Sequence, residues 1–201
     1  PELLECRREI WQAISGFSMR LISLTPGEFI HFGTTSELLR LVTHEISDYK
    51  FLNWNMQIGT NVEDTKYAVH NSLIAKGALI GENAYIENAM LCSGVRVGSG
   101  SIVSGLRLSG EKQVVPSGVV LHGLKLEDGR YTVRIFNVED NPKDLCGVMM
   151  SGTILQVLGE TMTLWDATIY PLCPSMEEAV QAAFITYRMM KGFASVEEKQ
   201  W

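Results

Sequence analysis

A repeat of seventeen residues restricts the fold of this chain more than any other feature. The segment Asn71–Gly81 can be laid over Asn88–Gly98, with Asn and two Gly at the same places and aliphatic residues between them. The aliphatic positions recur at steps of about six residues, which is typical of hexapeptide-type parallel β-helices, where each short strand turns a corner and stacks on its copy in the next coil. We therefore predict a mainly β protein built on a short parallel β-helix.

The repeat predicts two clear coils, residues 71–87 and 88–104, preceded by Tyr67–Val69 as the last strand of a partial coil. After these coils the pattern breaks at residues 109–112. It resumes at Pro116–His122, where Ser-Gly-Val matches the same tripeptide of the second coil if seven extra residues are inserted. We therefore expect two regular coils, one interrupted coil and one partial coil.

Aliphatic side chains at equivalent places in successive coils should form ladders, because stacked strands lie about 4.8 Å apart. The expected ladder positions are Ile74, Ile80, Ile86, Leu91 and Val97. Glycines are expected at the corners, where a missing Cβ allows a tight turn. These are Gly77, Gly81, Gly94 and Gly98. So short an array needs caps at its ends, and we expect the N-terminal helices and the C-terminal segment to supply them.

Two helices are predicted before the coils. Apolar residues at helical spacing between Leu3 and Ile14 predict the first, with Gly16 as its stop. Thr34 and Glu37 match a capping box, so a second helix should begin there and end near residue 46.

Less regular structure is expected around these helices. Residues 17–24 should be extended, Thr25-Pro26-Gly27 should form a turn, and Phe29–Phe32 should form a short strand. Residues 47–66 are interpreted as a connection into the coils, with Trp54 and Met56 as packing residues.

The C-terminal part should contain a hairpin, turns and helices. Asp-Gly between two alternating runs, Leu124–Leu126 and Tyr131–Phe136, predicts the hairpin. A turn is expected at Asn141–Asp144, and a strand at Leu164–Pro171.

Capping boxes predict two helices at the C-terminal end. The first starts at Ser175 with Glu178 and ends near Gly192. Its apolar face comprises Met176, Ala179, Val180, Ala183, Phe184 and Tyr187. The second starts at Ser195 with Glu198.

Charge and composition exclude several classes of protein. The net charge of −6 argues against a broad surface for nucleic acid or anionic membranes, although a local basic pocket for phosphate stays open. No uncharged apolar run reaches about 18 residues, and the acidic start lacks the apolar region of a secretory signal. The scattered cysteines Cys6, Cys92, Cys146 and Cys173 are expected to be buried free thiols of a cytoplasmic protein.

The sequence offers few catalytic candidates. It lacks a glycine-rich phosphate loop, a Gly-x-Ser-x-Gly elbow and a His-Glu-x-x-His motif. His70 and His122 are expected at coil corners, where hexapeptide acyltransferases place a general base. A merely solvated or hydrogen-bonded histidine is the alternative. His44 is expected on a helix surface.

The segment Phe29–Glu37 is the other candidate. It places a strand, a Gly and two hydroxyls before a helix whose first amides point outward, which favours an anion. A capped helix without a further role is the alternative, and the residues alone favour it.

Two motifs that flank the coils, His31–Leu39 and Leu164–Cys173, carry a resemblance to a known family. Together with the coils they resemble the middle of the bifunctional L-fucokinase / L-fucose-1-phosphate guanylyltransferase family. The resemblance implies that the β-helix is left-handed. It also implies three segments: residues 1–66, which close an upstream nucleotidyltransferase domain; residues 67–138, the β-helix and hairpin; and residues 139–201, which cap the coils.

The same resemblance implies a fucose-salvage enzyme. Its kinase part would phosphorylate L-fucose at C1 with ATP, and its other part would join fucose 1-phosphate to GTP, giving GDP-L-fucose and pyrophosphate with Mg²⁺ as cofactor. The family's two glycine-rich nucleotide loops have no counterpart here, so no catalytic residue is carried over. A substrate-binding or structural role is carried over for His31, Gly33, Thr34 and Thr35. We expect the chain to be an inactive fragment without a cofactor of its own.

Two other hypotheses stay open. One is a stand-alone hexapeptide acyltransferase, although such enzymes usually have more coils and form trimers. The other is a non-catalytic oligomerisation module. The expected partners are nucleotide and sugar-phosphate substrates of the longer protein and a second copy of the chain, with no nucleic acid and no membrane.

Overall fold

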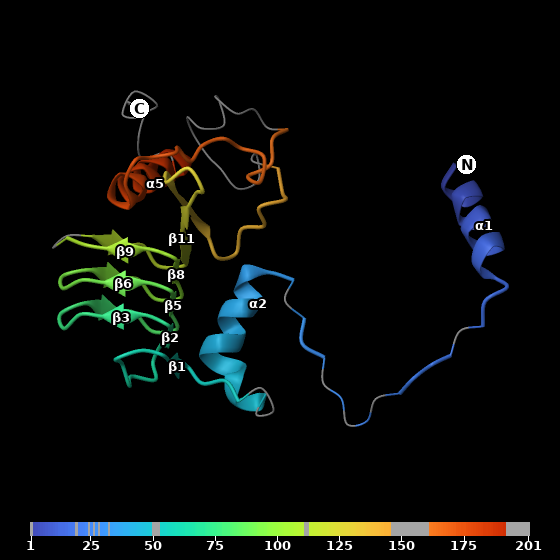
Figure 1. The fold of residues 1–201 in the computed structure, drawn as a ribbon, viewed down its shortest axis with the longest axis horizontal. Coiled ribbons are helices and arrows are strands. Elements are labelled where there is room, and N and C mark those ends of the chain that lie inside the picture. The colour runs from blue at the N-terminus through green and yellow to red at the C-terminus, as the bar shows by residue number, and fades with distance from the viewer. Residues whose placement is uncertain are drawn as a thin grey trace. The chain divides into compact units, whose positions relative to one another are not determined.

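The repeated segment folds into three-sided coils of a parallel β-helix (Figure 1). The computed structural model describes residues 2–18, 20–23, 25, 27, 29–31, 33–49, 53–110, 113–145 and 161–191. The chain divides into two compact units, Pro1–His31 and Phe32–Trp201. The coils and everything that positions the candidate site belong to the second unit.

The two predicted coils are confirmed, and each contributes three short strands. The first coil contains β3 (Leu73–Ile74), β4 (Leu79–Ile80) and β5 (Tyr85–Glu87). The second contains β6 (Met90–Leu91), β7 (Arg96–Val97) and β8 (Ile102–Ser104). Before them lie β1 (Gln57–Ile58) and the predicted last strand of the partial coil, β2 (Ala68–His70). The sequence did not predict β1.

A third coil follows, formed by β9 (Arg107–Leu108), β10 (Val114–Val115) and the start of β11 (Val119–Lys125). Val114 pairs with Arg96 and Val120 with Ile102, a spacing of eighteen residues, so one residue is added rather than seven. The predicted alignment was wrong because Ser-Gly occurs at two corners of the second coil, at Ser93 and at Ser99. Ser117 lies beside Gly98 just as Ser99 lies beside Gly81, so its counterpart is Ser99.

Three stacks of sheet make the faces of the helix. The largest has the strand order β1-β2-β5-β8-β11-β12, and the others are β10-β7-β4 and β3-β6-β9. The expected aliphatic ladders form: Ile74 lies below Leu91 and Ile80 below Val97. Ile86, Leu91 and Leu108 are fully buried, and each such side chain contributes about 1.5–3 kcal/mol by leaving water.

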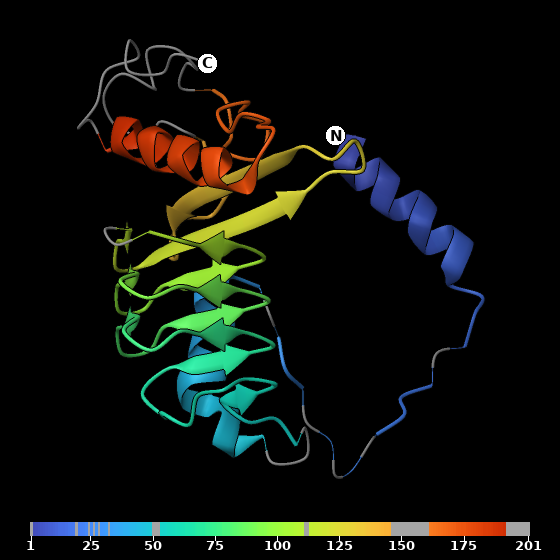
Figure 2. The same cartoon turned by 60° about the vertical axis from the view of Figure 1, so that its left-hand side comes forward.

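The predicted hairpin extends the last coil (Figure 2). Strand β11 continues antiparallel to β12 (Tyr131–Asn137) through the turn at Gly129, where φ is +85°. The predicted turn at Asn141–Asp144 also forms, since the Asp144 amide donates to the Asn141 carbonyl at 2.9 Å.

Helix α5 (Met176–Met190) covers the C-terminal end of the stack in both views (Figures 1 and 2). The Ser175 hydroxyl accepts a hydrogen bond from the Glu178 amide at 3.2 Å, which fixes its start. Ala179, Val180 and Ala183 are buried in one cluster with the coil residues. The C-terminal cap is therefore confirmed.

The predicted second helix is confirmed, but it does not cap the first coil. Helix α2 (Thr35–Arg40) continues as a π-helix, η1 (Leu41–Glu45), and a 3₁₀ turn, η2 (Ile46–Asp48). Leu39 and Val42 pack on Tyr85 and the residues that line up with it on the outer face of the large sheet. This helix therefore lies along the side of the coils (Figure 1).

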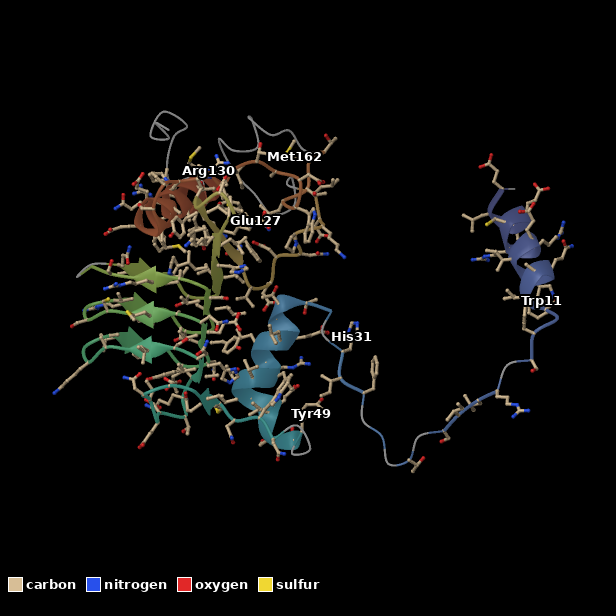
Figure 3. All side chains as sticks on the ribbon, viewed as in Figure 1. Trp11, His31, Tyr49, Glu127, Arg130 and Met162 are labelled. Carbon is tan, nitrogen blue, oxygen red and sulfur yellow. The ribbon has the colours of Figure 1, made fainter. Side chains whose placement is uncertain are left out.

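The N-terminal unit contains the predicted first helix, α1 (Glu2–Ile14). None of its described residues is buried, and Trp11 is 66% exposed (Figure 3). None of the described helices is both long and apolar enough to cross a membrane.

Some local predictions were wrong or cannot be compared. Residues 29–31 and 164–171 form no strand. The segment 164–171 is flanked only by isolated bridges, at Thr163 and Cys173. The described part of residues 17–24 has no strand partner either. Met56 packs as predicted, whereas Trp54 is 42% exposed. Pro26, Phe32, Cys146, Gly192 and the helix from Ser195 lie outside the described residues.

Candidate functional site

A hollow of about 510 Å³ opens beside the start of α2. Residues 33–36 line one side, and residues 138–143 with Trp165 line the other. Trp165 belongs to the second flanking motif of the sequence, whereas Gly33 and Thr34 belong to the first. The structure therefore brings the two motifs to one site, which the sequence did not predict.

Hydrogen bonds hold the walls of the hollow together. The Ser36 hydroxyl donates to Glu139 Oε1 at 2.9 Å, which ties α2 to the segment that follows the hairpin. The Trp165 amide donates to the Pro142 carbonyl at 2.9 Å. Trp165 itself is 68% exposed, so its indole is available to a ligand in the hollow.

Hydrogen bonds to β12 and α5 anchor the motif around Trp165. The Tyr170 hydroxyl donates to the carbonyl of Ile135 in β12, and the Thr186 hydroxyl of α5 donates to the Ile169 carbonyl at 3.1 Å. Ile169 is buried. Side-chain hydrogen bonds and the burial of Ile169, rather than strand pairing, therefore hold this motif in the wall of the hollow.

The amides before α2 are occupied by the protein itself. Glu37 Oε2 accepts hydrogen bonds from Gly33 at 2.7 Å and Thr34 at 3.0 Å, and the Thr34 hydroxyl accepts from the Glu37 amide at 3.1 Å. The predicted capping box is complete. An anion at these amides would meet the Glu37 carboxylate, so a binding role for Gly33, Thr34 and Thr35 rests on the hollow that they line.

His31 is not placed with these residues. It belongs to the N-terminal unit, where its ring stacks on Phe29 with centroids 6.3 Å apart. His44 is exposed as predicted, and its Nδ1 lies 2.8 Å from the Thr43 hydroxyl.

His70 and His122 lie on strands rather than at corners, because β2 and β11 extend further than the repeat indicates. Their positions align in one row across five strands, in the order His70, Glu87, Ser104, His122 and Arg134. The sequence repeat could have revealed the first three members of this row.

The row is a hydrogen-bonded network around Glu87. Its two carboxylate oxygens accept from the Tyr85 hydroxyl at 2.9 Å and the Ser104 hydroxyl at 2.6 Å. Burial and then the neighbouring Glu87 raise the pKa of Tyr85. His70 Nδ1 lies 3.0 Å from the Tyr85 hydroxyl, and Nε2 lies 2.9 Å from the Asn55 carbonyl. Since a carbonyl only accepts, Nε2 of His70 is the donor to Asn55.

The pKa of His122 in this row lies below its ordinary value. Burial lowers its pKa and Arg134 lowers it further, while Glu87 opposes them. The hydrogen bonds of this row favour a structural role for His70 and His122 over the role of a general base.

The described residues do not fit a protein-held metal centre. Among them, no group of three or more His, Cys, Asp or Glu side chains comes together in a way that could hold an ion. We therefore derive no step through Mg²⁺ from these residues.

Comparison with known proteins shows the family of this chain. The model of the fucose pyrophosphorylase domain matches residues 1–175, which include α1, the coils and the Trp165 motif. The chain belongs to this family. No solved structure matches it significantly.

Two curated relatives of this chain carry the same name. It is 23% identical over 211 residues to fucose-1-phosphate guanylyltransferase of Homo sapiens, an alignment that covers 89% of the chain and 35% of the relative. It is 22% identical over 215 residues to the Mus musculus protein, covering 90% of the chain and 36% of the relative. The chain thus spans about a third of the length of these relatives.

Proposed function

We propose that this chain is the β-helical part of an enzyme that makes GDP-L-fucose. In this reaction a phosphate oxygen of fucose 1-phosphate attacks the α-phosphorus of GTP, and pyrophosphate leaves. The match to the fucose pyrophosphorylase family over residues 1–175 carries the proposal, and the printed name of both curated relatives agrees with it. We extend it to a kinase activity of the longer protein, which would phosphorylate L-fucose with ATP, on the resemblance alone.

The β-helix itself has a structural role in this proposal, and the isolated chain is inactive. The sequence lacks a glycine-rich nucleotide loop. Its coils instead give a rigid frame that fixes α2 on one face and the Trp165 motif near its end. Mg²⁺ belongs to the longer protein, bound by residues other than those described. We place the enzyme in the cytoplasm.

The hollow beside α2 is the part of the chain that we propose lies nearest the substrate. Gly33, Thr34 and Thr35 line it, and Lys143 adds a cation. Trp165 adds an exposed aromatic face that can pack against a sugar ring or a base.

Self-association is a second proposed property, supported by exposed aliphatic residues on the outer faces of the coils. Leu73, Leu79 and Val114 are 53%, 57% and 56% exposed. A second copy of the chain would cover such a surface, since interfaces bury apolar residues at their centres.

Pyrophosphate release from GTP and fucose 1-phosphate tests the proposal. An N-terminally extended protein should release pyrophosphate, whereas residues 1–201 should not. Trp165→Ala in the extended protein should raise KM for fucose 1-phosphate, while His44→Ala, a control on the exposed helix surface, should leave it unchanged. The proposal is wrong if the extended protein releases no pyrophosphate, or if the chain binds acetyl-CoA and His122→Ala abolishes that binding.

A further inference from the structure

Two exposed cations share a groove that no carboxylate lines. The groove has a volume of about 720 Å³ and runs along one corner of the coils to the hairpin. Arg107 of β9 and Lys125 of β11 line it, and no Asp or Glu does. The whole chain carries a net charge of −6, so this groove has the opposite sign from the average surface. A local positive field of this kind attracts anions.

Neither cation forms an ion pair with another of the described residues. The described ion pairs involve other residues, among them Arg130 at the hairpin turn, whose Nη2 lies 2.6 Å from Asp128 Oδ2 (Figure 3). Lys125 Nζ lies 5.8 Å from the centroid of the Tyr131 ring, which holds the ammonium by a cation–π contact and leaves its protons free to donate.

A neutral donor completes the groove. Asn71 Nδ2 donates to Asn88 Oδ1 in the next coil at 2.7 Å, and both residues have a φ of 47° at the same corner. The third coil has Gly105 at this corner. A Cβ there would lie 2.6 Å from the Gly123 carbonyl oxygen, so no side chain fits. The amide ladder therefore stops at Asn88, whose Nδ2 has no acceptor among the described residues.

We propose that this groove binds a phosphate-bearing ligand through Arg107, Lys125 and Asn88. A guanidinium can give a phosphate two parallel hydrogen bonds, an ammonium adds a compact charge, and an amide adds a neutral donor. The groove shares no lining residue with the hollow beside α2. The site is therefore additional to the proposed function and does not depend on it.

Calorimetric titration of residues 1–201 with inorganic pyrophosphate, at low ionic strength and without Mg²⁺, tests the site. We expect saturable binding of one pyrophosphate per chain, about tenfold weaker in Arg107→Gln and in Lys125→Gln. Added salt should weaken it by screening. Parallel titrations with GDP and L-fucose 1-phosphate identify the source of the phosphate, since the native ligand class should bind most tightly.

Arg96→Gln is the matched control. Arg96 is exposed on β7, where it pairs with Leu79 and Val114, and it lies outside the groove. Its loss therefore removes one charge without touching the site. Asn88→Gly keeps the positive φ and removes the amide, and should weaken binding by a smaller factor. No saturable binding of any of the three phosphates overturns the proposal, as does equal weakening by Arg96→Gln and Arg107→Gln. No variant changes a buried side chain, and no readout requires turnover.

Discussion

The rings of His70 and Tyr85 meet edge to face, with centroids 5.1 Å apart and planes at 80°. His70 Nδ1 also lies 3.0 Å from the Tyr85 hydroxyl, which donates to Glu87. One phenol oxygen therefore connects a histidine and a carboxylate on adjacent strands. Because Tyr85 is 6% exposed, water can replace these bonds only poorly when one is lost.

Tyr85→Phe should therefore lower the free energy of unfolding by about 1–2 kcal/mol, since it removes the hydrogen-bond partner of Glu87 Oε2 and of His70 Nδ1. Urea unfolding followed by circular dichroism measures the change. Tyr131→Phe is the control, because the Tyr131 hydroxyl makes no hydrogen bond with the described residues and should be nearly neutral. Equal stability of the two variants would show that the row contributes nothing beyond packing.

His122 should make the stability of the chain depend on pH near neutrality. Its pKa in the folded state lies below the ordinary value, chiefly through burial. The unfolded chain therefore binds more protons between the two pKa values, so stability is present above about pH 6.5 and is lost as the pH falls through the folded pKa. His122→Gln should reduce the difference in unfolding free energy between pH 7.5 and pH 5.5, and His44→Gln, at an exposed site, should not. A difference that stays unchanged in His122→Gln would refute this assignment.

Gly98→Ala should destabilise the coils for a steric reason. A Cβ at Gly98 would lie 2.4 Å from the Ser117 backbone nitrogen, which cannot move without shifting the next coil. Thermal unfolding should show a loss of about 1–3 kcal/mol. Gly100→Ala tests backbone strain alone, since φ is +63° and the space is open, and should cost about 1 kcal/mol. A Gly98→Ala loss no larger than that of Gly100→Ala would mean that the coils can shift.

The sequence predicted those parts of the fold that depend on local pattern. The seventeen-residue repeat predicted two coils because each inward residue, such as Ile86, must meet its own copy. The third coil was misaligned because Ser-Gly at Ser93 and at Ser99 satisfies the same local rule. The position of α2 was also missed, since a capping box fixes where a helix begins and not which surface it covers.

The candidate sites were less predictable because they join residues that are distant in the sequence. Trp165 and Gly33 line one hollow only because the hairpin returns the chain to α2. The row from His70 to Arg134 depends on strand register. The phosphate groove depends on the contact between Gly105 and Gly123, which no repeat pattern contains.

Asn61 closes the open edge of the first coil, and its loss should loosen that edge alone. Its Oδ1 accepts from the Ile74 amide at 2.9 Å, and its Nδ2 donates to the Ile74 carbonyl at 2.8 Å, so one side chain replaces a missing strand. Asn61→Ala leaves both groups of Ile74 unpaired and should lower the unfolding free energy by about 1–2 kcal/mol. Hydrogen exchange measures the local effect: the Ile74 amide should exchange faster, while the amide of Leu91 in the next coil should keep its protection relative to global unfolding. Equal acceleration at both amides would show that Asn61 supports the whole stack rather than its edge.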